Sequence, residues 1–262
     1  MGLKKLSGEI FMEPKDSVEI VEITPIDVSK LNFLIGLPDI GLVGMISASH
    51  LVDSLGMKVV GYLESDLFPP VIVLHGSKIY HPFRIYQKDN ILLFLSEIPV
   101  PPLAVYAISR TITKWLKEKK PGLVIPLGGI PVPNRMAIEE PDVYTVATND
   151  TANKLIEDFS LRRLEEGIMA GPYASILMDC TKLDIPCLAL LAQSFPNYPD
   201  PGAAASVIKV INKILKTNID IGVLMKNAEE IRVKSRDLMQ RTSEQLETMG
   251  KSQEYDLPAM YS

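Results

Sequence analysis

Short apolar runs that alternate with helix-period segments are the feature that most constrains the fold of this chain. The runs are rich in Val, Ile and Leu, and several are apolar throughout, which is typical of strands covered on both faces of a sheet. We predict strands at residues 17–23, 31–36, 58–63, 71–74, 79–86, 91–95, 123–127, 142–147 and 187–191.

Helical segments separate most of these runs. Apolar residues recur at three-to-four spacing in residues 42–55, 103–119, 151–158, 173–183 and 201–216, which predicts helices there. Residues 71–95 are rich in strand-forming residues and contain no helical segment, so we expect antiparallel strands attached to a parallel core. The sequence therefore predicts an α/β fold, a three-layer αβα sandwich with a mixed sheet, over residues 1–219.

A different pattern begins after this body. Apolar and small residues alternate by four and three between charged ones, at Leu224, Ala228, Ile231, Ser235, Leu238, Thr242, Gln245 and Met249. We predict a C-terminal helix within residues 220–250, and a straight helix over these positions would extend about 39 Å. Two interpretations stay open, because the polar seam positions weaken self-association: the helix pairs with copies of itself or projects, or it lies along the body.

Composition limits the classes of partner. The net charge of -5 is unfavourable for binding nucleic acid, because phosphates attract a basic surface. No apolar run approaches the roughly 20 residues that span a membrane, and the N-terminus lacks a signal-peptide core. Cys180 and Cys187 have no metal-ligand spacing, so we expect buried reduced thiols and a cytoplasmic protein.

Glycine-rich turns are the candidate ligand sites of the body. Residues 36–44 read GLPDIGLVG after a predicted strand, where a helix N-terminus could hold phosphate. The spacing matches no known phosphate loop, so the alternative is that glycine allows tight turns and close packing. We expect this turn to lie near two others at the strand ends. The candidate residues are Gly36, Asp39, Gly41, Gly44, Gly128, Gly129 and Gly171.

Catalytic chemistry has little support in the sequence. No nucleophile has an evident base, as covalent catalysis requires. His50, His75 and His81 form neither a zinc-ligand pattern nor a Ser-His-Asp arrangement, and we expect ordinary packing or surface roles for them. We predict no catalytic residue, no metal and no cofactor.

The last three residues, Met260, Tyr261 and Ser262, can form a docking tail. A terminal carboxylate is an anion that a partner lysine or backbone amides can capture, and tyrosine adds aromatic area. Residues 251–262 are polar and interrupted by proline, which predicts a flexible tether that presents them. The alternative is an ordinary frayed end.

Several blocks together resemble the archaeal form of the proteasome assembly chaperone family. They are GLPDIGLVGMISASHLVDSLG, FPPVIVLHGSKI, IPLGGIPVPN and EEGIMAGPYASILMDCTKLDIPCLALLAQSFPNYPDPGAAASVIKVIN. The most specific part pairs residues 167–177 with residues 199–205, because the glycine turn, apolar helix, IP-strand and PDP-capped helix occur in the order of the family. The resemblance covers roughly residues 15–216.

This resemblance implies a body similar in architecture to purine nucleoside phosphorylases, without their activity. It implies a homo-oligomer, or an assembly with a paralogue, that contacts α-subunits of the proteasome core particle. Activators of the proteasome end in a hydrophobic-tyrosine-any tail, which Met260, Tyr261 and Ser262 match. Two alternatives remain: a small-molecule enzyme or sensor that uses the glycine turns, and a structural oligomer with an inert tail.

Overall fold

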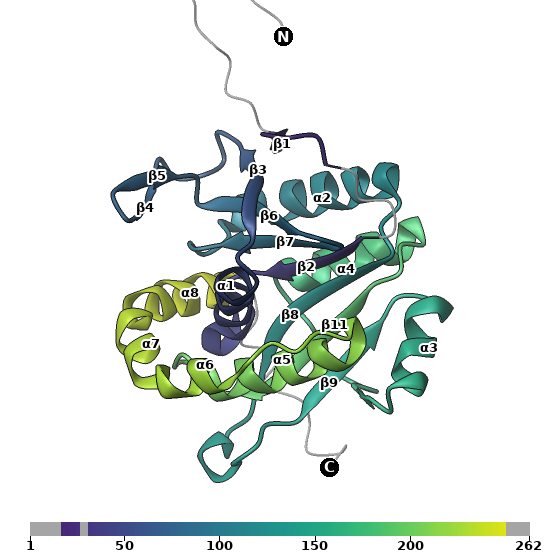
Figure 1. Cartoon of the computed structure of the whole chain (residues 1–262), viewed down its shortest axis with the longest axis vertical. Coiled ribbons are helices and arrows are strands. Elements are labelled where there is room, and N and C mark those ends of the chain that lie inside the picture. Colours follow the sequence, from purple (N-terminus) through teal and green to yellow (C-terminus); the bar gives the residue numbers. More distant parts are fainter. Residues whose placement is uncertain (1–16, 27–30, 250–262) are drawn as a thin grey trace, which may run out of the picture.

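The predicted apolar runs form one mixed sheet (Figure 1). The computed structural model describes residues 17–26 and 31–249. Within them, nine strands pair in the order β1-β3-β6-β7-β2-β8-β11-β9-β10. Their bounds are β1 (Glu19–Glu22), β2 (Asn32–Gly36), β3 (Lys58–Glu64), β6 (Phe83–Lys88), β7 (Ile91–Ser96), β8 (Leu123–Pro131), β9 (Val143–Ala147), β10 (Arg162–Arg163) and β11 (Leu188–Ser194).

The sheet has a parallel centre and an antiparallel half, as the sequence predicts. Strand β2 pairs in parallel with β7 and β8, and β8 pairs in parallel with β11. Strands β1, β3 and β6 continue from β7 by antiparallel pairing. On the other side β9 is antiparallel to β11, and β10 is parallel to β9. The α/β prediction with a mixed sheet is therefore confirmed.

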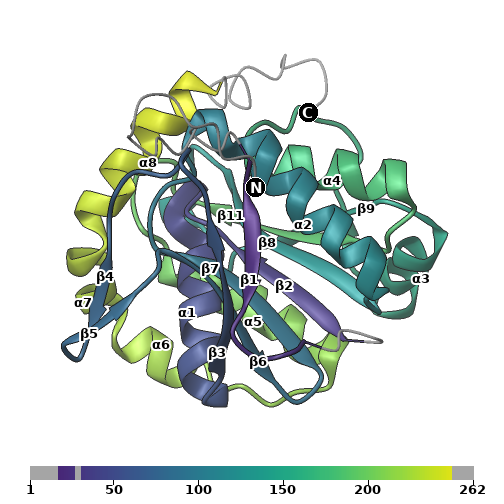
Figure 2. The same ribbon diagram turned by 90° about the horizontal axis from the view of Figure 1, so that it is seen from above.

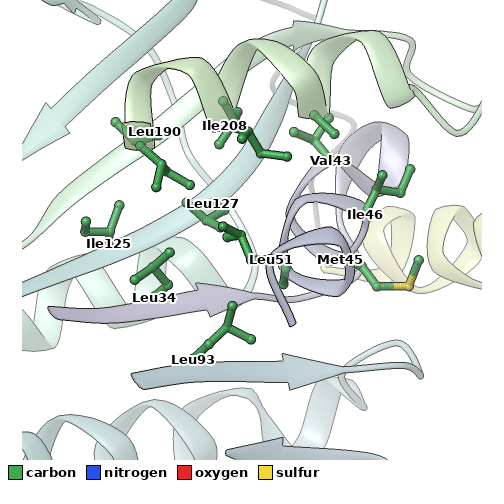
Figure 3. Close-up of a cluster of buried hydrophobic side chains, with 14 of the residues drawn as sticks. Leu34, Val43, Met45, Ile46, Leu51, Leu93, Ile125, Leu127, Leu190 and Ile208 are labelled. Atoms are coloured by element: carbon green, nitrogen blue, oxygen red, sulfur yellow. The ribbon is translucent and has the colours of Figure 1, made fainter. Parts of the chain in front are cut away.

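Apolar side chains alternate between the two faces of the central strands. In β2, Leu34 packs into one buried cluster, whereas Phe33 and Ile35 pack into the other. Figure 3 shows the first cluster, where Leu34 lies among side chains from the neighbouring strands and from helices above them. Both faces of a central strand are thus buried, which explains why these runs are apolar throughout.

Helices cover both faces and make three layers (Figures 1 and 2). Helices α1 (Val43–Leu55), α3 (Asp150–Asp158) and α5 (Pro201–Leu215) contribute to the first cluster. Helices α2 (Val105–Lys119) and α4 (Pro172–Leu183) contribute to the second. All five agree with the predicted helices to within a few residues.

Three predicted strands need correction. Residues 79–86 were expected to form one strand, but they divide into β5 (Lys78–Tyr80) and β6, because Pro82 has no N–H to donate to a ladder. Strand β5 pairs with β4 (Val73–His75) in a separate hairpin. The strand predicted at residues 71–74 corresponds to β4. Strand β8 continues four residues beyond the predicted end at Leu127, and the two-residue β10 was missed because it has no apolar pattern.

The C-terminal segment differs most from its prediction. A single straight helix is wrong, because the segment forms α6 (Gly222–Lys226), α7 (Ala228–Lys234) and α8 (Arg236–Thr248). The chain bends at Asn227 and Ser235, where φ is -95° at both. Leu224, Met239 and Leu246 are buried, so the bends let apolar positions follow the body. The geometry agrees with the alternative in which this segment lies along the body.

Candidate functional site

The glycine turn after β2 lies where the parallel strands end. A short 3-10 helix, η1 (Ile40–Leu42), joins β2 to α1, and Gly41 in it has a φ of 60°. A Cβ atom on Gly44 would lie 2.1 Å from the carbonyl oxygen of Leu127, and one on Gly36 would lie 2.2 Å from the Cβ of Ala48. Glycine at these positions therefore lets α1 approach the sheet closely.

The second glycine pair meets the first turn, as expected from the strand ends. A Cβ on Gly129 would lie 2.6 Å from the carbonyl oxygen of Ile40. A Cβ on Gly128 would lie 3.0 Å from the ring of Tyr173 and 3.3 Å from Oδ2 of Asp39. Backbone and side chains thus lie close against these glycines, and the geometry gives them a packing role.

The third turn positions a buried tyrosine. Gly171, with a φ of 80°, precedes α4, and Tyr173 lies in the first turn of that helix. Its hydroxyl accepts a hydrogen bond from the backbone N–H of Leu37 at 2.8 Å. Burial, and then the Asp39 carboxylate, raise the pKa of Tyr173 well above its ordinary value. Tyr173 therefore stays neutral and holds α4 to the first turn. The sequence analysis did not select it.

A buried ion pair connects the loop that follows β8 with the loop that follows β11. Arg135 donates to the carboxylate of Asp200 from Nε at 2.7 Å and from Nη2 at 3.0 Å. The same carboxylate accepts from the N–H groups of Phe195 and Ala203, and so caps α5. The N–H of Asp200 donates to the carbonyl of Gly41 at 2.8 Å. Asp200 therefore connects three loops by hydrogen bonds, and we call this set of contacts the Asp200 latch.

Exposed apolar side chains lie on the loops of the same edge. Leu103, Met136 and Tyr198 are 85%, 91% and 68% exposed, and they follow β7, β8 and β11. Because these strands are parallel and adjacent through β2, their following loops leave the same edge of the sheet. We call these three residues the apolar rim. Exposed hydrophobic groups of this kind are typical of protein-binding surfaces when they gather.

Helix α8 runs across this edge. It contacts η1, with Met239 in the buried cluster of one face and Met249 packed against the cluster of the other. Helix α8 therefore lies against the turn that follows β2. Met260, Tyr261 and Ser262, the predicted docking tail, lie outside the described residues.

Other predicted features can be placed in the described part of the chain. Cys180 and Cys187 are free and buried, as expected, and burial, with Cys180 beside it, raises the pKa of Cys187 well above its ordinary value. Within residues 17–26 and 31–249, no group of three or more His, Cys, Asp or Glu side chains could hold a metal ion. None of the helices described is long and apolar enough to cross a membrane.

Comparisons with known proteins agree with the fold. A model of the PAC2 family matches residues 33–239. An uncharacterized protein of Methanocaldococcus jannaschii is 29% identical over 239 residues, which covers 90% of this chain and 96% of the relative. The crystal structure of PbaA from Pyrococcus furiosus, an archaeal homolog of proteasome-assembly chaperone, has a TM-score of 0.81 and 30% identity, covering 87% of this chain and 98% of PbaA.

A more distant solved structure shares the fold. PbaB of Pyrococcus furiosus, an archaeal proteasome activator, has a TM-score of 0.71 and 23% identity, and the match covers 85% of this chain and 98% of PbaB. The resemblance predicted from the sequence blocks is thereby confirmed at the level of family and fold.

Proposed function

This chain belongs to the PAC2 family, and we propose that it is a proteasome-binding protein that acts by docking rather than by catalysis. The observation that carries the proposal is the match to PbaA, which extends over 87% of this chain at 30% identity. The glycine turns add support, because their close contacts with neighbouring backbone and side chains account for glycine at the edge where α/β sheets commonly bind ligands.

We assign the docking face to the edge with the apolar rim. Leu103, Met136 and Tyr198 give this edge exposed apolar surface, and the Asp200 latch connects the loops that carry Met136 and Tyr198. Ordered loops lose little conformational entropy when they bind a partner. Helix α8, which precedes residues 250–262 in the sequence, contacts η1 at this edge.

The tail supplies the second contact. Met260, Tyr261 and Ser262 match the hydrophobic-tyrosine-any pattern of proteasome activators, and we propose that they enter pockets between α-subunits of the core particle. The Ser262 carboxylate would pair with a pocket lysine, and Tyr261 would add aromatic contact. The mechanism requires a free carboxylate on Ser262.

Self-association would strengthen such weak contacts. A homo-oligomer, or an assembly with a paralogue, would present several tails to one α-ring. The second tail then docks at an effective concentration that reaches roughly millimolar values if the tether geometry permits. Both an assembly chaperone and an ATP-independent activator would use this arrangement, in the cytoplasm, and they differ in whether the partner is an assembly intermediate or the mature core.

The tail is tested by binding to immobilised core particle and by stimulation of its peptidase activity. We expect the intact chain to bind, and Tyr261→Ala or a C-terminal extension of a few residues to weaken binding at least about tenfold. Tyr255→Ala is the matched control, because it removes a tyrosine of the same segment outside the terminal triplet. Equal binding by all four proteins would show that the tail does not dock.

The rim is tested separately. Met136→Glu and Tyr198→Glu place a charge on exposed positions and should leave the fold intact while weakening binding to the core particle. Val233→Glu is a control on α7, also at an exposed apolar position. If the rim variants bind as well as Val233→Glu does, this edge is not the docking face.

Light scattering after size exclusion gives the oligomeric state, and a monomer at all concentrations contradicts the multivalent mechanism.

A further inference from the structure

A cavity of about 590 Å³ lies over the antiparallel half of the sheet. Helix α1 packs on β2, β7 and β8, and the cavity is lined by residues of α1, of β3, β6 and β7, and of the β4–β5 hairpin. Apolar groups from four elements line the cavity, and they are Val52, Val59, Tyr86 and Leu95. Its volume is in the range of pockets that hold small molecules.

The cavity has a buried arginine in its wall. Arg84 on β6 is 2% exposed, and its guanidinium carbon lies 4.9 Å from the ring centroid of Tyr80 and 5.5 Å from that of Tyr86. Nη2 forms an ion pair with Glu97. Nε has no hydrogen-bond partner among the described residues. A buried N–H group without an acceptor costs free energy, so an acceptor that binds at Nε would stabilise the guanidinium.

Charges of both signs surround Arg84. The Glu97 carboxylate also accepts a hydrogen bond from Nε2 of His75, and its Oε2 lies 2.8 Å from that nitrogen. Asp53 of α1 and Lys58 of β3 line the same cavity. Burial, followed by the charge of Arg84, lowers the pKa of His75 below its ordinary value, so His75 is neutral near pH 7. The cavity thus presents two cations and two carboxylates.

We propose that this cavity binds a small zwitterion with an apolar side chain, of the class of the α-amino acids. The ligand carboxylate would accept from Arg84, and its ammonium group would donate to Asp53 and Glu97. A simple anion would be repelled by the two carboxylates, and a simple cation by Arg84 and Lys58. The apolar wall of Val59 and Leu95 accommodates the side chain.

The site has an approach from a second cavity. A groove of about 890 Å³ between α1 and α6–α7 shares Ser49, Asp53 and His75 with it. The site shares no residue with the apolar rim, so variants of one can be tested without changing a residue of the other.

Titration calorimetry on the full chain tests the requirement for both charges. L-leucine and L-phenylalanine are the probes, and isocaproate and isoamylamine are leucine without its ammonium and without its carboxylate. We expect at least one amino acid to bind. We expect each half-ligand to bind at least about tenfold more weakly than leucine, because it lacks charge-assisted hydrogen bonds. Binding of isocaproate as tight as that of leucine would show a simple anion site and overturn the proposal, as would no binding by either amino acid.

Substitutions locate the site. Arg84→Met should abolish amino-acid binding, and Asp53→Asn, at an exposed helix position that leaves the fold intact, should weaken it at least about tenfold. Asp158→Asn on α3 is the control, because it makes the same change on an exposed helix away from the cavity, and its binding should equal that of the unchanged chain. Unchanged binding by folded Arg84→Met, or by Asp53→Asn, would place the ligand elsewhere and overturn the proposal.

Discussion

Two buried arginines each form an ion pair with a carboxylate, but the two pairs differ in burial and in hydrogen bonding. At the edge where the parallel strands end, Arg135 and Asp200 are 8% and 0% exposed, and hydrogen bonds to three loops surround the pair. In the antiparallel half, Arg84 is buried but Glu97 is 20% exposed, and Nε of Arg84 has no acceptor among the described residues. We call Arg135–Asp200 the complete pair, because it is buried and hydrogen-bonded to its surroundings. We call Arg84–Glu97 the incomplete pair, and it lies in the wall of a cavity.

This difference shows where a doubly covered sheet can bind a small molecule. Parallel strands commonly place ligands beyond their carboxyl ends. Here the glycine turns and Tyr173 pack closely together, and Leu103 and Met136 are exposed on loops of the same edge. A cavity instead lies over the antiparallel half, between α1, the sheet and the β4–β5 hairpin.

The largest effect is expected at the complete pair. Asp200→Ala removes the α5 cap and leaves Arg135 buried without its carboxylate, so we expect unfolding free energy to fall by about 3–5 kcal/mol. Urea unfolding measures it. Asp142→Ala, which breaks the exposed pair with Arg162, is the control and should cost less than about 1 kcal/mol. Similar losses for the two variants would remove the basis for calling Asp200 a latch.

A smaller effect is expected from filling the closed edge. A methyl group on Gly44 must displace the backbone oxygen of Leu127, so Gly44→Ala should destabilise the protein by about 2–3 kcal/mol. Thermal unfolding and binding to the core particle are the two measurements. A stable Gly44→Ala protein would mean that the edge has spare room, and the ligand site predicted at the glycine turns would regain support.

Substitution of Gly76, in the hairpin beside the cavity, should destabilise the protein less than substitution of Gly44. Gly76 lies in the turn of the β4–β5 hairpin with a φ of 54°, and nothing lies within 4 Å of the Cβ that alanine would add. Gly76→Ala should therefore cost only the strain of the left-handed conformation, about 1 kcal/mol. A loss in urea unfolding as large as that of Gly44→Ala would contradict the difference in packing between the two regions.

The smallest effect on stability is expected at the incomplete pair. Arg84→Met removes a buried charge that makes few hydrogen bonds, and Glu97 stays partly hydrated beside His75, so unfolding free energy should change by less than about 1 kcal/mol. The comparison fails if Arg84→Met costs as much as Asp200→Ala in the same urea titration.

Local patterns were sufficient for most of the body. The central strands and all five core helices were predictable, because burial on both faces selects continuous apolar runs and one-sided burial selects three-to-four spacing. The predictions were wrong where local pattern was weak or interrupted. Pro82 divided a predicted strand, and Asn227 and Ser235 bend a segment whose spacing favoured one straight helix.

The candidate sites divide in the same way. Glycine spacing correctly brought Gly36, Gly44, Gly128 and Gly129 to one edge, but could not show that backbone atoms fill the space between them. Tyr173 was missed because its only local signal is a place in the first turn of a helix. His75 was expected to have an ordinary role, and its neighbours Arg84 and Glu97 had no signal, because strand pairing and the hairpin bring them together.

By itself, the sequence determined the α/β class, the mixed sheet, the family resemblance and the terminal triplet Met260, Tyr261 and Ser262. These depend on residue types and short spacings. Only the tertiary structure decided that Asp200 connects the loops of the carboxyl edge, that Arg84 lies in a cavity wall, and that α8 contacts η1. The physical reason is that burial and charge pairing depend on contacts between residues distant in the chain, which no local pattern records.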